Sequence, residues 1–447
     1  MSNPTKAEAY ADLKKRDRII AALLTLGRYL PFGALFGTRF ERDFSSATVK
    51  PQTGEFLVPE EFHDSDETAL FEELSHLFAS DVTKHPKGIG KRNPDHQDAH
   101  WGHSTGLVNG TLTIDQIDNL PEQFRVGLFE SNGNYKIIGR PNYLYEHPTI
   151  AVARLALKLE FPVDVPNVYA PSGTARELDL LLSEGVRQSE TGDQDGQGFF
   201  FRDARQLLLA NSLKTGALKA FWMLINSANG KVYTRWNEIF KASTDTLYSK
   251  EQRQKGWAGK NYFSAGPYAL GGGLMKFAIK PLQTNPIADI DPKLENPATH
   301  LKEAFASWRQ AGVPAEFEFQ VQIARWDSIK APADEELPPK AIMAAEFTDL
   351  VWDEEVSPFV SVGRLTLQPA DWDAFGEWYG SGEDRWNPEA GFAPHALRFN
   401  AWNTLDVMRP VGQLFRARKF VHHHHRDVRL EHSFQETPNG PSKCPFG

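Results

Sequence analysis

Histidine offers the main reactive chemistry in this chain, which contains 14 histidines and a single cysteine. Seven of these histidines form two clusters. His96, His100 and His103 lie in the stretch D-H-Q-D-A-H-W-G-H-S-T-G, and His422–His425 lie in K-F-V-H-H-H-H-R-D-V-R. Imidazole nitrogen is a common ligand of first-row transition metals, so either cluster can hold a metal ion or the metal of a cofactor.

Neither cluster has the H-E-x-x-H spacing of a zinc enzyme. Cys444 is the only cysteine, so a disulfide within the chain and a cysteine cage for zinc or iron–sulfur are both excluded. Three interpretations stay open for the histidines: structural or solvated side chains, a site for bare nickel, copper or zinc, and ligands of a bound cofactor.

Composition predicts a folded globular protein, because 40% of the 447 residues are hydrophobic and 24% are charged. The net charge of −9 argues against nucleic acid as a partner, since phosphate binding needs a cationic face. The apolar run Ile19–Gly27 is shorter than the about 20 residues that a membrane span needs. We therefore expect an amphipathic helix over residues 5–30, no transmembrane span and a cytoplasmic location.

The secondary structure that would position these residues is expected to change from helices to strands and back along the chain. An acidic helix is expected near Glu67–Ala79, and helices and turns over 205–255. Alternation and β-branched or aromatic content predict strands in between and afterwards. The expected strands are Leu107–Ile114, Phe124–Phe129, Tyr135–Arg140, Ala151–Phe161, Leu274–Lys280, Glu316–Ile323 and Phe359–Leu367, the last after a loop at Pro332–Pro339.

The clearest of these strands is Glu316–Ile323, where polar and apolar residues alternate with a period of two. Such a strand buries one face and exposes the other to water. This order of elements predicts an α+β fold, in which the helices are segregated around an antiparallel sheet or barrel.

The segment Arg418 to Arg429, R-K-F-V-H-H-H-H-R-D-V-R, resembles the proximal haem segment of catalases and of smaller bacterial catalase-like proteins. In that family an Arg precedes the iron-ligating Tyr by four residues, and a second Arg, near a haem propionate, follows the ligand by seven. Arg418, His422 and Arg429 reproduce this spacing. The resemblance implies that His422 ligates the iron of haem b in place of tyrosine, with His423–His425 as rivals.

Other stretches follow in the family's order and extend the resemblance from about Glu73 to Glu431. They are Ala99–Leu112, Leu120–Phe129, Gly266–Pro281, Ser357–Leu365, Phe399–Leu405 and Arg409–Gly412. The resemblance implies a catalase-like antiparallel β-barrel core with helices added at both ends, and self-association into a homo-oligomer.

The expected organisation has three parts. Residues 1–80 form an N-terminal helical arm, 81–432 form the haem-binding domain, and 433–447 form a tail. Within the domain, we expect the barrel core over about 100–370 and a helical region over about 371–432.

For the distal side of the haem, the resemblance implies His100 as the catalytic histidine, with His103 as its competitor. The family's Arg three residues before the distal histidine is Gln97 here, and Arg92 is the nearby candidate to replace it. Asp195 falls where the family has an asparagine. A carboxylate there can accept or relay a proton, whereas an amide only forms hydrogen bonds.

Two further residues are implied as haem contacts. Arg140, in I-I-G-R-P-N-Y, lies where the family has a propionate-binding arginine, and Phe200, in the run Phe199–Phe201, would form a wall of the pocket. A structural role for Arg140 and a plain core role for the Phe run are the alternatives.

A neutral histidine ligand pushes less electron density toward iron than a phenolate does. The implied function is therefore a catalase-related oxidoreductase that acts on hydrogen peroxide or an organic hydroperoxide, as a peroxidase or peroxygenase rather than a classical catalase. Rearrangement of a fatty-acid hydroperoxide, as in allene oxide synthases, is the next alternative. A haem-binding or sensing protein without catalysis is another.

Overall fold

The computed structural model describes residues 42–47, 54–84, 102–104, 106–147, 150–185, 198–199, 201–212, 256–282, 297–330, 338–370 and 399–421. The helix expected over 5–30 lies outside these ranges. Among the helices within them, none is long and apolar enough to cross a membrane.

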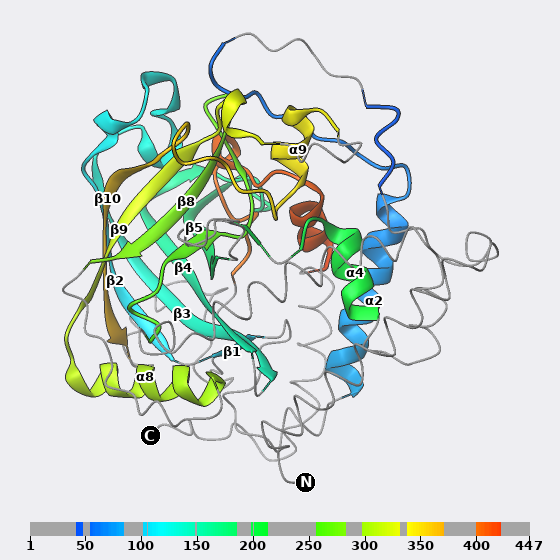
Figure 1. Cartoon of the computed structure of the whole chain (residues 1–447). Coiled ribbons are helices and arrows are strands. Elements are labelled where there is room, and N and C mark those ends of the chain that lie inside the picture. The colour runs from blue at the N-terminus through cyan, green and yellow to red at the C-terminus, as the bar shows by residue number, and fades with distance from the viewer. Residues whose placement is uncertain are drawn as a thin grey trace.

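Ten antiparallel strands form one sheet, and eight of them close into a barrel (Figure 1). Around the barrel the order is β3-β2-β10-β9-β8-β6-β5-β4, and β4 pairs with β3 to complete the circle. The strands are β1 (Gly102–Ser104), β2 (Leu107–Ile114), β3 (Gly133–His147), β4 (Ile150–Pro166), β5 (Thr174–Glu184), β6 (Tyr262–Ser264), β7 (Tyr268–Leu270), β8 (Gly273–Pro281), β9 (Ala315–Ile323) and β10 (Phe359–Ala370). The predicted α+β class with an antiparallel barrel core is confirmed.

The interior of the barrel is filled by the apolar face of each strand. On β9, Phe317 and Phe319 are fully buried, while Glu316 and Glu318, which alternate with them, point to the outer face. The ring of Phe319 lies 6.3 Å from those of Phe129 and Phe277. The period of two predicted for this strand therefore sets which side chains form the core.

Several parts of the chain differ from the expectation, and the strand β5 and the helix at Pro297–Ala311 are among the elements that were not predicted. Phe124–Phe129 forms two short 3₁₀ turns, Glu122–Phe124 and Gly127–Phe129, so the strand predicted there is wrong. Its apolar residues are buried inside turns instead, and Gly127 has a φ of 62°, which ends extended backbone. Between the loop after Pro332 and β10, the short helix α9 (Lys340–Glu346) was not predicted.

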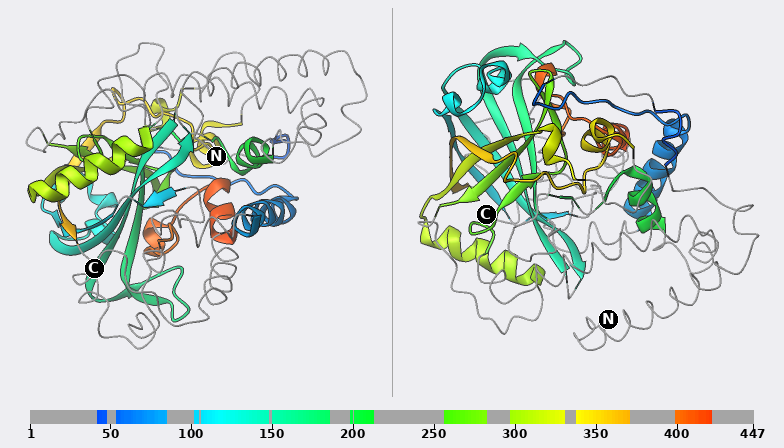
Figure 2. Two further views of the ribbon diagram at one scale, coloured as in Figure 1. Left: turned by 90° about the horizontal axis from the view of Figure 1, so that it is seen from below. Right: turned by 45° about the horizontal axis from the view of Figure 1, so that its top comes forward.

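The helices lie outside the barrel (Figure 1). The helix α8 (Pro297–Ala311) packs against β3, β4 and β10, and α2 (Glu67–Lys84) packs against α4 (Ala204–Ser212). Residues 413–421 form a helix that we call the C-terminal helix segment. In both views of Figure 2 this segment, in red, lies between the barrel and α2.

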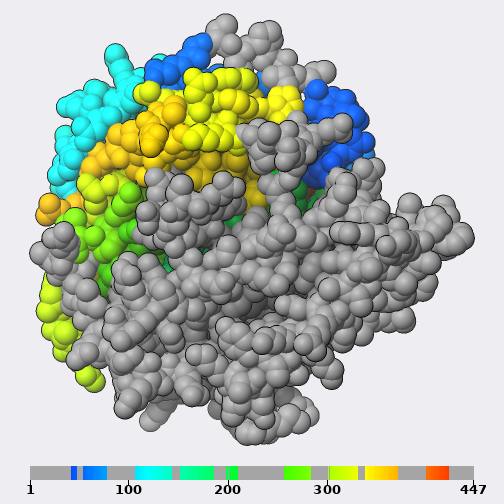
Figure 3. Space-filling view, in the orientation of Figure 1, coloured from blue at the N-terminus to red at the C-terminus, as the bar shows by residue number. Residues whose placement is uncertain are grey.

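A lysine is buried on the outer face of β8, where the chain around α9 covers the barrel. The ammonium of Lys276 donates a hydrogen bond to the carbonyl of Leu350 at 2.5 Å and lies 4.6 Å from the ring centre of Trp352. Burial lowers the pKa of Lys276 to about 7, against the attraction of Asp349. In the space-filling view, the yellow surface around α9 adjoins the blue N-terminal part of the chain (Figure 3).

Candidate functional site

Of the residues predicted to carry chemistry, the structure describes the side chains of two, Arg140 and Arg418. The backbone of His103 is described, in β1, where it pairs with Tyr143 of β3. The other predicted residues lie outside the described ranges: His100, Asp195, Phe200, His422 and Arg429.

Arg140 lies on the outer face of β3 and is 7% exposed. Its guanidinium carbon lies 5.5 Å from the ring centre of Phe399, and the ammonium of Lys158 lies 5.8 Å from the same ring. A cation over an aromatic face is a favourable arrangement, more so when water is excluded. Phe399 therefore brings two buried cations from neighbouring strands of the barrel together.

Lys158 is neutralised by carboxylates of β5. Its ammonium lies 2.6 Å from Asp179 and 3.1 Å from Glu177. Asp179 also accepts a hydrogen bond at 2.8 Å from the backbone N–H of Asn400. Burial raises the pKa of Asp179, although Lys158 opposes the shift. These contacts hold the segment that begins at Phe399 against the outer face of β4 and β5.

Arg418 occupies a different environment, between two aromatic rings. Its guanidinium carbon lies 5.0 Å from the ring centre of Phe199 and 5.6 Å from that of Phe415. The guanidinium of Arg154, from β4, lies 5.9 Å from the same Phe199 ring. In the part of the chain that the structure describes, no carboxylate forms an ion pair with Arg418.

The two positive charges affect each other. Removal from water and the like charge of Arg154 together lower the pKa of Arg418 to about 9. A guanidinium with this pKa still carries its charge at neutral pH. Arg418 is thus a partly buried cation that lies beside a second cation, Arg154.

Tyr268, on β7, adds a buried hydroxyl next to this pair. Its ring centre lies 5.1 Å from that of Phe415, which also contacts Arg418. The side chain is 2% exposed, and its hydroxyl has no hydrogen-bond partner among the described residues. Burial raises the pKa of Tyr268, so its hydroxyl stays protonated and can donate a hydrogen bond.

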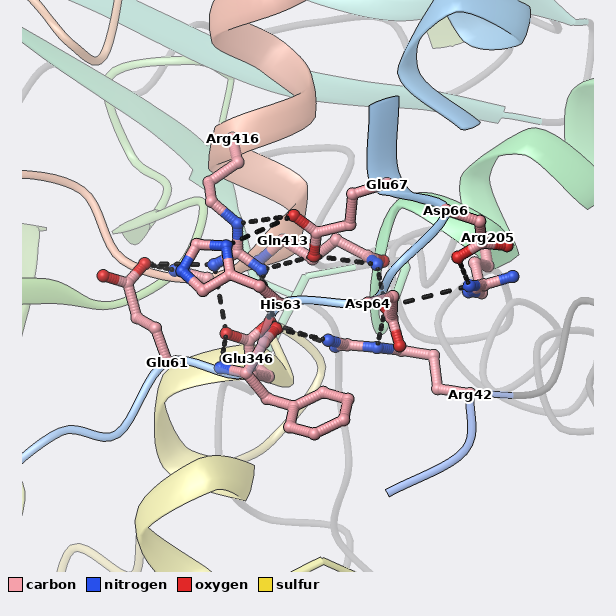
Figure 4. Close-up of polar contacts among 12 residues, drawn as sticks. Arg42, Glu61, His63, Asp64, Asp66, Glu67, Arg205, Glu346, Gln413 and Arg416 are labelled. Carbon is pink, nitrogen blue, oxygen red and sulfur yellow. Dashed lines mark hydrogen bonds and ion pairs between the residues drawn. The ribbon is translucent and has the colours of Figure 1, made fainter. Parts of the chain in front are cut away.

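The opposite side of the C-terminal helix segment contacts a set of charged and polar residues, most of them buried or partly buried, that we call the ionic network (Figure 4). The ionic network consists of Arg42, Glu61, Asp64, Asp66, Glu67, Arg205, Glu346, Gln413 and Arg416. It connects α2, α4, α9 and the C-terminal helix segment. Burial raises the pKa of Asp64, although Arg42 and Arg205 oppose the shift.

Glu346 is the centre of the ionic network and is 0% exposed. Its carboxylate accepts hydrogen bonds from Arg42 at 3.0 Å and from Arg416 at 3.1 Å. It also accepts bonds at 2.9 Å from the backbone N–H groups of Phe62 and Gln413. Gln413 begins the C-terminal helix segment, so Glu346 satisfies an N–H at the positive end of that helix.

Glu61 fixes the same helix end from the other side. It accepts a hydrogen bond from the backbone N–H of Gly412 at 3.2 Å and ion pairs with Arg409 and Arg416. Burial alone would raise the pKa of Glu61, but the bonds from Arg409 and Gly412 bring it below its ordinary value. Gly412 has a φ of 97°, and a Cβ there would lie 2.3 Å from the carbonyl of Ala345.

The ionic network therefore sets how the C-terminal helix segment is rotated. Successive residues of an α-helix are 100° apart, so Arg416 and Arg418 point to nearly opposite sides. With Arg416 held by Glu67 and Glu346, Arg418 faces Phe199 and Arg154. We regard Arg416 and Glu346 as positioning residues for the segment that leads into His422.

Sequence reasoning missed Arg154, Tyr268 and the ionic network. Arg154 lies in a strand whose sequence shows only the usual alternation of polar and apolar residues, and Tyr268 lies in a strand of three residues. No local sequence pattern therefore marks either residue as functional. The acidic stretch at Glu61–Glu67 and the arginine two residues before Arg418 were the available signals for the ionic network. Among the described residues, no group of three or more His, Cys, Asp or Glu is arranged to hold a metal ion.

Among the comparisons with known proteins, the one with solved structures gives matches. No family model matches the chain, and no curated protein matches it. Solved structures of catalases are similar to it.

A bacterial catalase gives a TM-score of 0.42 at 14% identity, over 90% of this chain and 70% of the catalase. A fungal catalase gives 0.40 at 15% identity, over 90% and 70%. Catalase A from Saccharomyces cerevisiae gives 0.39 at 14% identity, over 90% and 72%. At these TM-scores, no cofactor, residue role or activity is inferred from the likeness.

Proposed function

We propose that this protein binds haem b and acts as an oxidoreductase on hydrogen peroxide or an organic hydroperoxide, as a peroxidase or peroxygenase. The observation that carries the proposal is the environment of Arg418. This arginine was predicted as a haem contact from its spacing to His422, and it lies partly buried between Phe199 and Phe415, beside Arg154.

The residues present fit the cofactor. Haem is a flat aromatic molecule with two carboxylates and needs one axial ligand from the protein. Around Phe199 and Phe399 the described residues offer aromatic rings and the guanidinium groups of Arg140, Arg154 and Arg418. Guanidinium groups are the best partners for carboxylates, because they can donate two parallel hydrogen bonds.

The roles follow from the chemistry of each side chain. His422, which follows directly after the C-terminal helix segment, would hold the iron through an imidazole nitrogen. Arg140 and Arg429 would pair with carboxylates of the haem, and Phe200 would line the pocket. The bound cofactor would supply the redox chemistry that breaks an O–O bond.

The protons would be handled by the chain itself. His100 or His103 would take a proton from the hydroperoxide and return it to the departing oxygen, a contribution on the order of 10² to 10⁴ in rate. Asp195 would hold or relay a proton beside that histidine. A histidine axial ligand favours oxidation of an organic donor over classical catalase turnover.

The activity is tested with haem-loaded full-length protein, hydrogen peroxide and a phenolic electron donor, followed by donor oxidation. We expect donor oxidation well above that of free haemin, and a rate lower by two orders of magnitude or more when both His100 and His103 are replaced by alanine. A matched His63→Ala variant, whose imidazole is exposed near the ionic network, should keep the wild-type rate.

Two results would contradict this proposal. Conversion of a fatty-acid hydroperoxide to rearranged products without donor oxidation would make the protein a rearranging enzyme. Haem binding with no reaction toward any hydroperoxide would make it a non-catalytic haem protein.

A further inference from the structure

The chain that precedes α4 is held by the residues that follow α9, and Thr348 makes the central contact. The backbone N–H of Phe199 donates a hydrogen bond to the carbonyl of Thr348 at 2.9 Å. The N–H of Thr348 donates in turn to the carbonyl of Arg202, also at 2.9 Å. Both backbone polar groups of Thr348 therefore bind the stretch around Phe199, as buried backbone groups must bind some partner.

Side chains strengthen this contact. Thr348 is 1% exposed, and its hydroxyl donates a hydrogen bond to the carbonyl of Phe201 at 2.5 Å. The carboxylate oxygens of the buried Asp349 lie 3.2 and 3.3 Å from Nε of Arg202. The guanidinium carbon of Arg202 also lies 4.3 Å from the ring centre of Phe347. The three residues after α9 thus hold the stretch around Phe199 through a ring, a hydroxyl and a carboxylate.

The two segments approach so closely that position 198 has no room for a side chain. A Cβ on Gly198 would lie 2.7 Å from the carbonyl oxygen of Asp349. The segment after α9 is itself fixed to the barrel, because the ammonium of Lys276 on β8 donates a hydrogen bond to the carbonyl of Leu350. The position of Phe199 therefore depends on a segment that is anchored on the outer face of the barrel.

The ring of Phe199 connects this contact with the candidate site. The ring is 4% exposed, and the guanidinium carbon of Arg418 lies 5.0 Å from its centre. Arg418 belongs to the C-terminal helix segment, which His422 follows directly. We infer that Thr348 and Asp349 are positioning residues, which fix the Phe199 ring so that the ring fixes Arg418 and the end of this helix segment. The consequence for haem rests on the proposed function, whereas the consequence for the helix segment is independent of it.

Three variants of the full-length protein test this inference. Thr348→Val removes the hydroxyl and keeps the shape, Thr348→Ser keeps the hydroxyl, and Gly198→Ala places a methyl group against the carbonyl of Asp349. Thr111→Val is the matched control, because Thr111 is exposed on β2. Amide hydrogen exchange without haem is measured by mass spectrometry in two peptides, one that contains Phe199 and one that covers the C-terminal helix segment. Haemin binding is followed by the Soret band, and urea denaturation confirms that each variant is folded.

We expect Thr348→Val and Gly198→Ala to speed exchange in both peptides roughly 3- to 10-fold, because a lost hydrogen bond makes local opening easier. Haemin binding should weaken by a similar factor. Thr348→Ser and Thr111→Val should stay close to the wild type, and the rescue by serine would assign the effect to the hydroxyl. Exchange that rises only in the Phe199 peptide, or in neither peptide, would overturn the inference, because the ring would then not hold Arg418.

Failure of the proposed function has a different signature. It appears as the absence of a Soret band when haemin is added to the wild type. In that case faster exchange in both peptides would still support the positioning role of Thr348 and Asp349. Faster exchange in both peptides together with unchanged haemin binding would overturn the consequence for haem and support the consequence for the helix segment.

Discussion

Replacing Glu346 by alanine is expected to lower the free energy of unfolding by roughly 3–5 kcal/mol. The carboxylate is fully buried, and it accepts hydrogen bonds from Arg42 and Arg416 and from the backbone of Phe62 and Gln413. Its removal leaves two buried guanidinium groups without this partner and two N–H groups without an acceptor. The ionic network would also release the start of the C-terminal helix segment.

The measurement is urea denaturation followed by tryptophan fluorescence, with the midpoint and slope compared between proteins. Glu303→Ala is the matched control, because Glu303 is exposed on α8 and its loss should change stability by no more than about 0.5 kcal/mol. A loss for Glu346→Ala as small as that of the control would mean that the ionic network does not hold the C-terminal helix segment in place.

The second large effect concerns Lys276 and depends on pH. Its pKa in the folded protein is about 7, below the ordinary 10.5, because the amine is buried. Between these values the unfolded chain binds a proton that the folded protein does not, so this group makes stability rise with pH. The free-energy penalty for burying this amine is fully present below about pH 7 and is gone above about pH 10.5.

Lys276→Met replaces the amine with an apolar side chain of similar length. We expect the stability of the wild type relative to this variant to rise by roughly 1 kcal/mol per pH unit between about 7 and 10.5. Taking the difference between the two proteins removes the contribution of other titrating groups. Denaturation midpoints at a series of pH values give this difference. A difference that does not change with pH would mean that Lys276 stays charged beneath Trp352.

Much of the barrel is predictable from local patterns. Strands such as β9 and β10 alternate, and alternation follows from the geometry of a sheet with one buried face. The helix α9 escaped prediction because its residues are buried by contact with Leu57 and Val411, far away in the sequence. The turns around Gly127 were not predicted, because a short run of apolar residues has the sequence pattern of a buried strand.

The candidate site, like the barrel, was predictable from the sequence only in part. Arg418 was found through the spacing of a family motif and Arg140 through its place in a family stretch, and the structure places both beside aromatic rings. Arg154 and Tyr268 could not be found, because their significance depends on the approach of β4 and β7 to the C-terminal helix segment. The roles proposed for His100, His103, Asp195, Phe200, His422 and Arg429 remain predictions.

Haem binding through His422 is tested most directly by adding haemin to the purified protein and recording absorption and resonance Raman spectra. His422→Ala and His424→Ala are compared with the wild type. We expect a Soret band with the signature of a histidine ligand in the wild type and in His424→Ala, and its loss in His422→Ala. A wild type without a Soret band, or a His422→Ala variant with an unchanged spectrum, would contradict the assignment.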